Sequence, residues 1–258
     1  MKKHIFLIKF GGSIITDKDK EYTPNLGDIR NLSKQLKNTK GLVILAHGSG
    51  SFGHTSAKKY GGTKGYKSRY GIAKVARDAM EINRIVMDSL IEQKIPAVSL
   101  RPGSMMIAQK GKLEKSFFEV IEILLRQGII PVVYGDVIWD KSWKSTIFSG
   151  ETVLNKISSY LVKKGYKIKA DIQVGTTDGV YDKDGRTIPV IDKKNWVAIK
   201  PGIEKVSYDV TGGMVHKIEN SLDLAKKGIT TIIINGTRKN SLKNILTGKK
   251  VNNVTVIK

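Results

Sequence analysis

The chain has 258 residues, 40% of them hydrophobic, and its 45 Lys+Arg against 23 Asp+Glu give a formal net charge of +22. This length suffices for a substantial buried core, and the absence of cysteine excludes disulfides, thiol nucleophiles and cysteine-ligated zinc, which favours a reducing compartment such as the cytoplasm. The charge suits anionic partners, but basic residues are spread from Lys2 to Lys258 without a long tail or an aromatic-rich RNA-binding motif, so nucleic acid is not the expected partner.

Short apolar segments alternate with longer segments of helical period along the chain, which is the pattern of a mainly parallel sheet covered by helices. Runs of Val, Ile and Leu predict strands at His4–Phe10, Leu42–Ala46, Ala97–Leu100, Ile129–Tyr134, Asp171–Gly175 and Thr230–Ile234. Apolar spacings of three and four predict helices at Asn25–Lys37, Gly71–Gln93, Lys115–Gln127, Glu151–Lys163 and Val215–Lys227. Several of these helices are expected to end at a glycine, namely Gly128, Gly165 and Gly228.

Turns and ends of the chain complete this outline. Trp139–Trp143 predicts a hairpin between two short strands, and Asp182–Arg186 predicts an exposed turn. The apolar stretch within Met1–Phe10 is followed too soon by glycines and charges for a signal peptide or a membrane span, so no membrane association is expected. We see no repeat or linker, and expect one domain over residues 1–258.

The most distinctive segment is the apolar run Leu42–Ala46, which leads into a glycine loop, Gly48–His54. Glycine backbones reach positive φ and let amides approach a ligand, and a following helix start adds unsatisfied N–H groups that favour phosphate. The segment therefore predicts a strand that opens onto an anion-binding loop.

The glycines of this loop also fit G-x-G-x-x-G, the fingerprint of a dinucleotide-binding fold. That fold uses an acidic residue about twenty positions further on to hold a ribose hydroxyl. The chain has no Asp or Glu from Thr55 to Arg77, so this interpretation is disfavoured, although a variant that binds NADP through Arg69 stays open. A Walker A loop is absent.

Four motifs follow predicted strands, where open α/β sheets bind ligands. They are Lys9-Phe10-Gly11-Gly12-Ser13 leading to Lys18, the loop Gly48–His54, Gly135-Asp136-Val137 with the later Ser149-Gly150-Glu151, and Asp209-Val210-Thr211-Gly212-Gly213-Met214 followed by Lys217. In this order, from Lys9 to about Gly236, they closely resemble the amino-acid kinase superfamily. The histidine that ends the glycine loop and the downstream Asp-Val-Thr-Gly-Gly-Met resemble the branch that contains isopentenyl phosphate kinases and fosfomycin kinases.

The resemblance implies a three-layer αβα sandwich around a mainly parallel sheet, the amino-acid kinase fold, with acceptor binding mainly N-terminal and ATP binding mainly C-terminal. It also implies a homodimer and, as activity, transfer of the γ-phosphoryl group of ATP to isopentenyl phosphate, giving isopentenyl diphosphate and ADP in an alternative mevalonate route of isoprenoid biosynthesis. Magnesium is expected to enter with ATP, held mainly by phosphate oxygens and water rather than by protein ligands.

The residues can be assigned to this chemistry because phosphoryl transfer needs cations and amides around a charge-rich transition state, and an ionised phosphate acceptor needs no general base. Expected catalytic residues are Lys9, Lys18, His54 and Lys217. Expected nucleotide contacts are Lys9, Gly11, Gly12, Ser13, Gly50, Asp178, Gly212, Gly213 and Lys217. Expected acceptor contacts are Ser49, Gly50, Gly53, His54, Asp136 and Gly150. Asp136 and Glu151 are expected to orient lysines, and His47 is expected to be structural.

Three motifs depart from the usual pattern of the superfamily, at four positions. Ser49 stands where many relatives have glycine, which retains the amide but disfavours positive φ. Glu151 and Thr152 replace a pair of aspartates, and Thr176 replaces the first aspartate of a motif near the nucleotide. These departures leave the placement of the orienting acid and of the ribose contacts open.

Two alternative functions remain at this stage. A fosfomycin or other phosphonate kinase would bind an acceptor whose anionic group resembles a phosphate. An apolar pocket would instead favour an isoprenoid tail, and its expected lining residues are Ile72, Val75, Ala76 and Phe148. A non-catalytic ATP- or nucleic-acid-binding regulator would account for the charge of +22. Retention of the catalytic lysines and of the loop histidine argues against lost catalysis.

Overall fold

A computed structural model describes residues 4–37, 39–62, 65–66, 68–206 and 213–258. The strands of its large sheet are β1 (Ile5–Phe10), β2 (Leu42–His47), β5 (Ala97–Ser99), β8 (Ile130–Tyr134), β11 (Ile168–Gly175), β12 (Val190–Ile191), β13 (Thr231–Asn235) and β14 (Thr255–Ile257). Their order across the sheet is β12-β14-β13-β11-β1-β2-β8-β5, and all adjacent pairs are parallel except β13 with β14. The expected mainly parallel sheet is confirmed.

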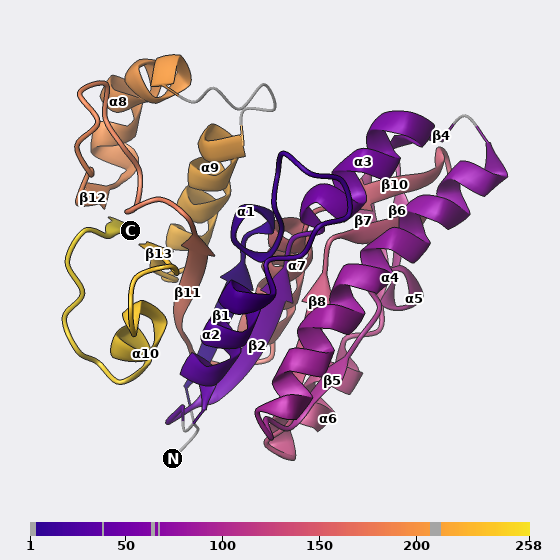
Figure 1. Ribbon diagram of the computed structural model, residues 1–258, viewed down its shortest axis with the longest axis horizontal. Helices are drawn as coiled ribbons and strands as arrows, with labels where there is room; N and C mark the ends of the chain where they lie inside the picture. The colour runs from indigo at the N-terminus through magenta and orange to yellow at the C-terminus, as the bar shows by residue number, and fades with distance from the viewer. Residues whose placement is uncertain (1–3, 38, 63–64, 67, 207–212) are drawn as a thin grey trace.

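Helices cover both faces of this sheet (Figure 1). One face carries α1 (Gly12–Ile15), α2 (Leu26–Leu36), α4 (Arg69–Glu92) and α10 (Ser241–Leu246). The other carries α6 (Glu119–Arg126), α7 (Gly150–Lys163), α8 (Lys193–Val206) and α9 (Gly213–Ala225). The three-layer αβα architecture follows from these two coverings.

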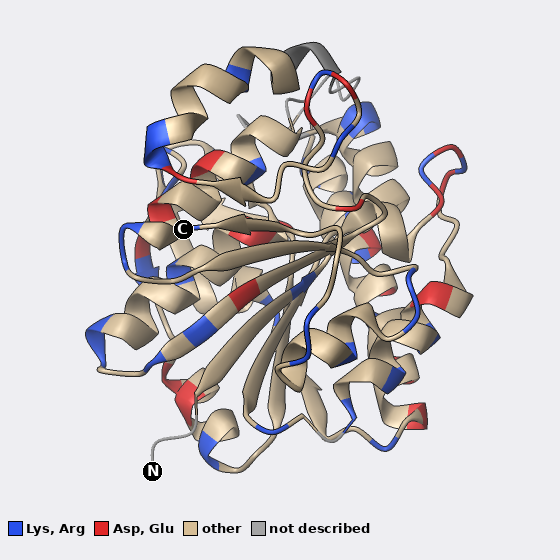
Figure 2. Cartoon of the chain, turned by 90° about the vertical axis from the view of Figure 1, so that its left-hand side faces the viewer, with Lys and Arg blue, Asp and Glu red and all other residues tan. Residues whose placement is uncertain are grey.

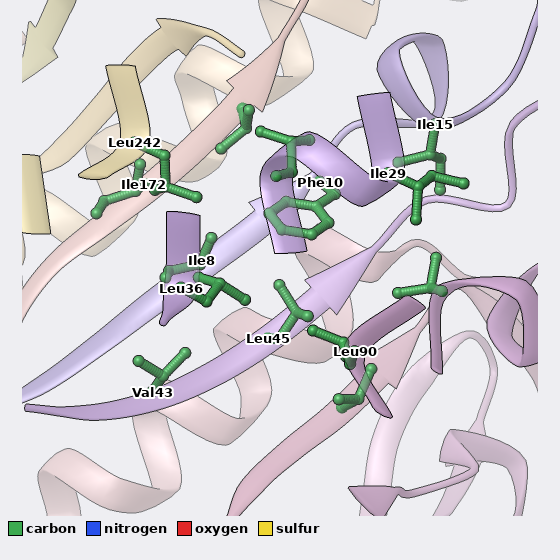
Figure 3. Close-up of a cluster of buried hydrophobic side chains, with 14 of the residues drawn as sticks. Ile8, Phe10, Ile15, Ile29, Leu36, Val43, Leu45, Leu90, Ile172 and Leu242 are labelled. Carbon is green, nitrogen blue, oxygen red and sulfur yellow. The ribbon is translucent and has the colours of Figure 1, made fainter. Parts of the chain in front are cut away.

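The sequence of β1 explains how both faces are buried. All six of its residues are buried, and alternate side chains point to opposite faces of a strand. Ile8 and Phe10 pack with Leu36 of α2 and Leu90 of α4, as Figure 3 shows. Leu7 instead joins the cluster under α6 and α7. Lys9 alternates with Ile8 and Phe10, so it lies on the α7 side.

A smaller sheet, with strand order β10-β9-β6-β7, lies beside the large one. Its strands are β6 (Met106–Gln109), β7 (Lys112–Ser116), β9 (Asp136–Asp140) and β10 (Lys144–Phe148). The Asp140 carboxylate accepts hydrogen bonds from the amides of Lys110, Gly111, Ser142 and Trp143, at 2.7–3.2 Å. One side chain therefore stabilises the turns of two hairpins, including the one predicted at Trp139–Trp143.

The remaining elements are α3 (Gly50–Tyr60), α5 (Pro102–Met105) and the short pair β3 (Gly61–Gly62) and β4 (Gly65–Tyr66). The six predicted strands are confirmed, and the predicted glycine helix ends have positive φ at Gly128, Gly165 and Gly228. The helix predicted from Lys115 is wrong in its first turn. Lys112–Ser116 form β7 because they pair antiparallel with β6, and the helix begins only at Glu119.

The basic residues are not concentrated on one helix or strand. Lys and Arg lie on helices, loops and strands across the side drawn in Figure 2. No helix in the described ranges is both long enough and apolar enough to cross a membrane.

Candidate active site

Three of the four motifs come together because parallel strands end at the same edge of their sheet. The fourth lies mostly outside the described residues, and its described part begins α9, which follows α8 and not the predicted strand. β1, β2 and β11 are adjacent and parallel, and α3 and α7 begin at Gly50 and Gly150 near this edge. Helix N-termini carry partial positive charge and unpaired amides, so the edge favours anions before any side chain is considered.

The first two glycine motifs touch through their backbones. A Cβ on Gly12 would lie 2.8 Å from the Gly50 Cα, and one on Gly48 would lie 2.8 Å from the Gly12 nitrogen. Thr16 connects them further, since its hydroxyl donates to the Gly12 carbonyl at 2.8 Å and accepts from the Ser51 amide at 2.9 Å. Glycine is required here because no side chain fits between the two loops.

The glycine loop also shows which of its residues takes a positive φ, the conformation that serine disfavours at position 49. The residue with positive φ is Gly50, at +49°, whereas Ser49 has φ −88° and ψ −10°, an ordinary right-handed conformation. The expectation of strain at Ser49 is therefore not met, because the left-handed conformation falls one residue later. Gly53, also an expected acceptor contact, lies against the Ser49 hydroxyl in the first turn of α3.

Lys9 and Glu151 form an ion pair at the end of β1. Lys9 Nζ donates to Glu151 Oε1 at 2.6 Å, and the Lys9 and Glu151 side chains are only 9% and 19% exposed. Burial alone would raise the pKa of the Glu151 carboxyl, but the charges of Lys9 and Lys217 and the hydrogen bond from Lys9 hold it below its usual value. Glu151 thus remains ionised between two of the expected catalytic lysines.

A second carboxylate, Asp171, is buried on the same side of the sheet. It accepts from Gln173 Nε2 at 3.0 and 2.8 Å and from Thr231 Oγ1 at 3.3 Å, and Gln173 is the partner of Lys9 across the β1–β11 pair. Burial raises the pKa of Asp171 to about 6, although these hydrogen bonds oppose the rise. Our sequence analysis did not identify Asp171, since an isolated aspartate in a strand carries no recognisable pattern.

Lys18 and His54 line one open groove of about 380 Å³. Lys18 comes from the loop between α1 and α2, and His54 comes from the first turns of α3. Lys20 and Lys58 add cations to the groove, Ser51 and Thr55 add hydroxyls, and Asp19 and Glu21 add two carboxylates. The groove can hold an anion of the size of a phosphomonoester between a lysine and a histidine.

Asp136 lies at the start of β9 and has a charged partner that the sequence did not predict. Its Oδ2 accepts from Arg101 Nε at 3.3 Å and from the Gly103 amide at 3.0 Å, and its Oδ1 accepts from the Val137 amide at 2.8 Å. Burial raises the pKa of the Asp136 carboxyl above its usual value despite these contacts. The described partners thus include an arginine where a lysine was expected.

His47 is structural, as expected. Its Nδ1 is 2.8 Å from the Gly48 carbonyl, its Nε2 is 3.0 Å from Asn83 Nδ2, and its ring stacks on Tyr134 at 5.4 Å. Burial lowers the pKa of His47 to about 4, so the ring is neutral, with Nδ1 donating to the carbonyl and Nε2 accepting from the amide. The ring fixes the backbone where β2 enters the glycine loop.

Only some of the expected nucleotide contacts lie within the described residues. Gly11, Gly12 and Ser13 begin α1, Gly213 begins α9, and Lys217 lies one turn further along α9. Gly212 and the rest of Asp209–Thr211 lie outside the described residues. Asp178, in the loop after β11, forms an ion pair with Arg238, and this pair holds the pKa of the Asp178 carboxyl low.

Three of the four residues expected to line an apolar pocket pack together in one cluster, and that they line a pocket stays a prediction. Val75 and Ala76 of α4 cluster with Val137 of β9, and Ile72 packs against them. Phe148 belongs to a different cluster, under α6 and α7. Among the residues that the structure describes, no three histidine or acidic side chains gather closely enough to hold a metal ion.

Comparison with known proteins identifies the family. Residues 4–235 match the model of the amino acid kinase family. The chain belongs to this family. Among its relatives, the isopentenyl phosphate kinase of Methanothermobacter thermautotrophicus is 31% identical over 96% of this chain and 97% of that protein. The isopentenyl phosphate kinase of Thermoplasma acidophilum is 30% identical over 93% of this chain and 96% of that protein.

Solved structures of isopentenyl phosphate kinases are also similar to this chain. One described as "X-ray structures of isopentenyl phosphate kinase" aligns with a TM-score of 0.82 and 29% identity, over 98% of this chain and 100% of that one. A substrate complex of an isopentenyl phosphate kinase aligns with a TM-score of 0.78 and 25% identity, over 99% of this chain and 100% of that one. This member of the amino acid kinase family thus has the fold that its motifs predict.

Proposed function

We propose that the protein transfers the γ-phosphoryl group of ATP to isopentenyl phosphate, producing isopentenyl diphosphate and ADP. The observation that carries this proposal is the groove shared by Lys18 and His54, which Ser51 also lines beside the touching glycine loops. The Lys9–Glu151 pair lies at the end of β1, the strand that leads into the first of these loops. The isopentenyl phosphate kinases among its relatives support the choice of acceptor.

The chemistry needs two anions to approach in line. An ionised oxygen of the acceptor phosphate forms a bond to the γ-phosphorus, the bond to the bridging β–γ oxygen breaks, and ADP leaves with that electron pair. In this proposal His54 donates to the acceptor phosphate, and Lys9, Lys18 and Lys217 stabilise charge on the transferring group. Glu151 keeps Lys9 directed toward the edge of the sheet.

The proposal extends to ATP, magnesium, assembly and location. The lysines and amides of the edge suit the phosphates of ATP, and Mg²⁺ bound to those phosphate oxygens and to water would neutralise part of their charge. We infer a homodimer from the family resemblance, which light scattering after gel filtration tests. A cytoplasmic location fits the absence of cysteine and the need for ATP.

The test is phosphoryl transfer by the purified protein with ATP and MgCl₂, followed by ³¹P NMR with isopentenyl phosphate, dimethylallyl phosphate or fosfomycin as acceptor. We expect isopentenyl diphosphate, and we expect His54→Ala to lower kcat/KM for the acceptor about 100-fold. His4→Ala, an exposed histidine before β1, is the matched control. Transfer to fosfomycin alone would indicate a phosphonate kinase, and salt-sensitive RNA binding without any transfer would indicate a regulator.

A further inference from the structure

The loop between α1 and α2 carries Lys18, and its base is fixed by the backbone. Thr16 and Pro24 form an antiparallel bridge, and the Asp17 amide donates to the Thr23 carbonyl at 2.9 Å. These contacts close the base of the loop but do not by themselves direct Lys18 into the groove that it shares with His54. A contact nearer the tip of the loop is needed to hold this lysine.

Tyr22 supplies that contact. Its ring meets the Phe52 ring of α3 edge-on at 5.7 Å, and Lys74 Nζ of α4 lies 4.9 Å from the ring centre. Tyr22 has φ +51°, a left-handed conformation that is unfavourable for a bulky residue and persists only where surrounding contacts enforce it. The loop is therefore held in a costly conformation by two neighbouring helices.

The contact with α4 rests on a buried carboxylate. Asp78 is fully buried, and both of its oxygens accept from Lys74 Nζ, at 2.6 and 2.5 Å. Lys74 and Asp78 lie close enough to the Tyr22 hydroxyl for their charges to act on its pKa, which burial and Asp78 raise and Lys74 lowers. Arg77 Nη1 also donates to Asp78 Oδ1, at 3.4 Å, whereas the pair between Arg84 and Asp88 further along α4 is exposed.

Helix stability does not explain this partly buried pair. A lysine four residues before an acid is the less favourable order for an i,i+4 pair, and burying the Asp78 carboxylate carries a desolvation cost. What the pair does provide is a fixed polar anchor under Tyr22. The same helix contributes Val75 and Ala76 to the apolar cluster beside β9.

We propose that Tyr22, Lys74 and Asp78 form a positioning cluster that holds the loop of Lys18 against α3 and α4, so that Lys18 faces His54. The inference rests on the proposed function, because it assigns Lys18 a part in phosphoryl transfer. It adds that α4, which carries the expected acceptor lining, also sets the place of this catalytic lysine. None of the three residues need touch a substrate.

A double-mutant cycle tests the cluster. Tyr22→Phe keeps the ring and removes the hydroxyl beside Lys74 and Asp78, and we expect kcat to fall about fivefold with little change in KM for ATP, which corresponds to about 1 kcal/mol of lost positioning. Lys18→Met is expected to lower kcat about 100-fold. In the Lys18→Met background, Tyr22→Phe should have almost no further effect, because the lysine that it positions is gone.

A second measurement does not depend on activity. Trypsin cleaves after Lys18 and Lys20, and mass spectrometry should show faster cleavage there in Tyr22→Phe and Asp78→Asn than in the unmutated protein. Asp88→Asn, the same change at an exposed position of α4, is the control and should alter neither cleavage nor kcat. A wild-type protein that transfers no phosphoryl group would refute the proposed function, while unchanged loop cleavage, or an equal loss of kcat with and without Lys18, would refute the cluster.

Discussion

Glu151 is partly buried and Asp171 is buried on the same side of the large sheet, and their surroundings move their pKa values in opposite directions. Glu151 is paired with Lys9 at 2.6 Å, and its pKa is lowered. Asp171 accepts hydrogen bonds from the neutral Gln173 and Thr231, and its pKa rises to about 6. Burial disfavours the charged form of both groups, so the presence of a direct cationic partner decides which of them stays charged.

The difference assigns the two residues different tasks. Glu151 stays ionised and can orient Lys9 at the edge where phosphates are proposed to bind. Asp171 lies deeper, and the negative charge of Glu151 adds to the rise in its pKa while Lys9 opposes it. Asp171 therefore costs stability when ionised, and the two carboxylates should respond differently to neutralisation.

The largest effect is expected from Glu151→Gln. Removing the charge leaves the buried Lys9 uncompensated, which should destabilise the protein by about 3 kcal/mol and misplace the lysine. We expect kcat to fall about 100-fold. Chemical denaturation and steady-state kinetics measure the two effects separately.

Two variants control this experiment. Glu151→Asp keeps the charge and restores the acid that is usual in relatives, so it should recover most of the lost stability. Glu114→Gln removes a carboxylate from an exposed pair with Lys141, 2.7 Å apart, and should change neither quantity. Full activity in Glu151→Gln would show that Lys9 needs no counter-ion.

Asp171→Asn should have the opposite sign and should depend on pH. The pKa of this carboxyl is raised from 3.8 to about 6, so folding favours the protonated form. The cost is absent below about pH 4, grows as pH rises through 6, and reaches about 3 kcal/mol. Asparagine carries no such cost, so the variant should gain up to this amount relative to the unmutated protein.

Urea unfolding between pH 4 and 8 measures the difference. The free energies of unfolding of the two proteins should diverge from pH 4 to 7 and run parallel above that. A constant difference over the whole range would show that Asp171 does not titrate within it. Activity at pH 7.5 should change less than in Glu151→Gln, because Asp171 has no direct contact with the described catalytic lysines.

The contrast also shows what the sequence could predict. Glu151 was found because it follows Ser149-Gly150 in a motif with a known order, and the strands were found from their apolar runs. Asp171 was missed because an isolated aspartate in a strand forms no motif, and one of its partners, Thr231, is distant in sequence on another strand. The Tyr22 cluster was missed because Tyr22 lies in a loop far in sequence from Lys74 and Asp78 on α4. Such pairs depend on strand order and helix placement, which local patterns do not encode.

The backbone at Ser49 and the strand β7 are two further features that the sequence did not predict. Ser49 was recognised from the motif, but only the backbone reveals that Gly50 takes the left-handed conformation. Lys115 and Ser116, predicted to begin a helix, instead end the strand β7 because β6 offered a partner. Tertiary pairing therefore overrode local preference where a segment was short and polar.

The smallest effect is expected from Thr231→Val, which removes the long 3.3 Å hydrogen bond to Asp171 while keeping a β-branched shape in a fully buried strand position. The hydroxyl supports the ionised carboxylate more than the protonated one, so at pH 8 its loss should destabilise the protein by about 1 kcal/mol more than at pH 4. Comparing the two pH values cancels the packing change that Val introduces. In the Asp171→Asn background the dependence on pH should disappear, because no charge remains for the hydroxyl to stabilise. If it persists there, another group near β13 titrates, and the raised pKa of Asp171 does not account for the contrast with Glu151.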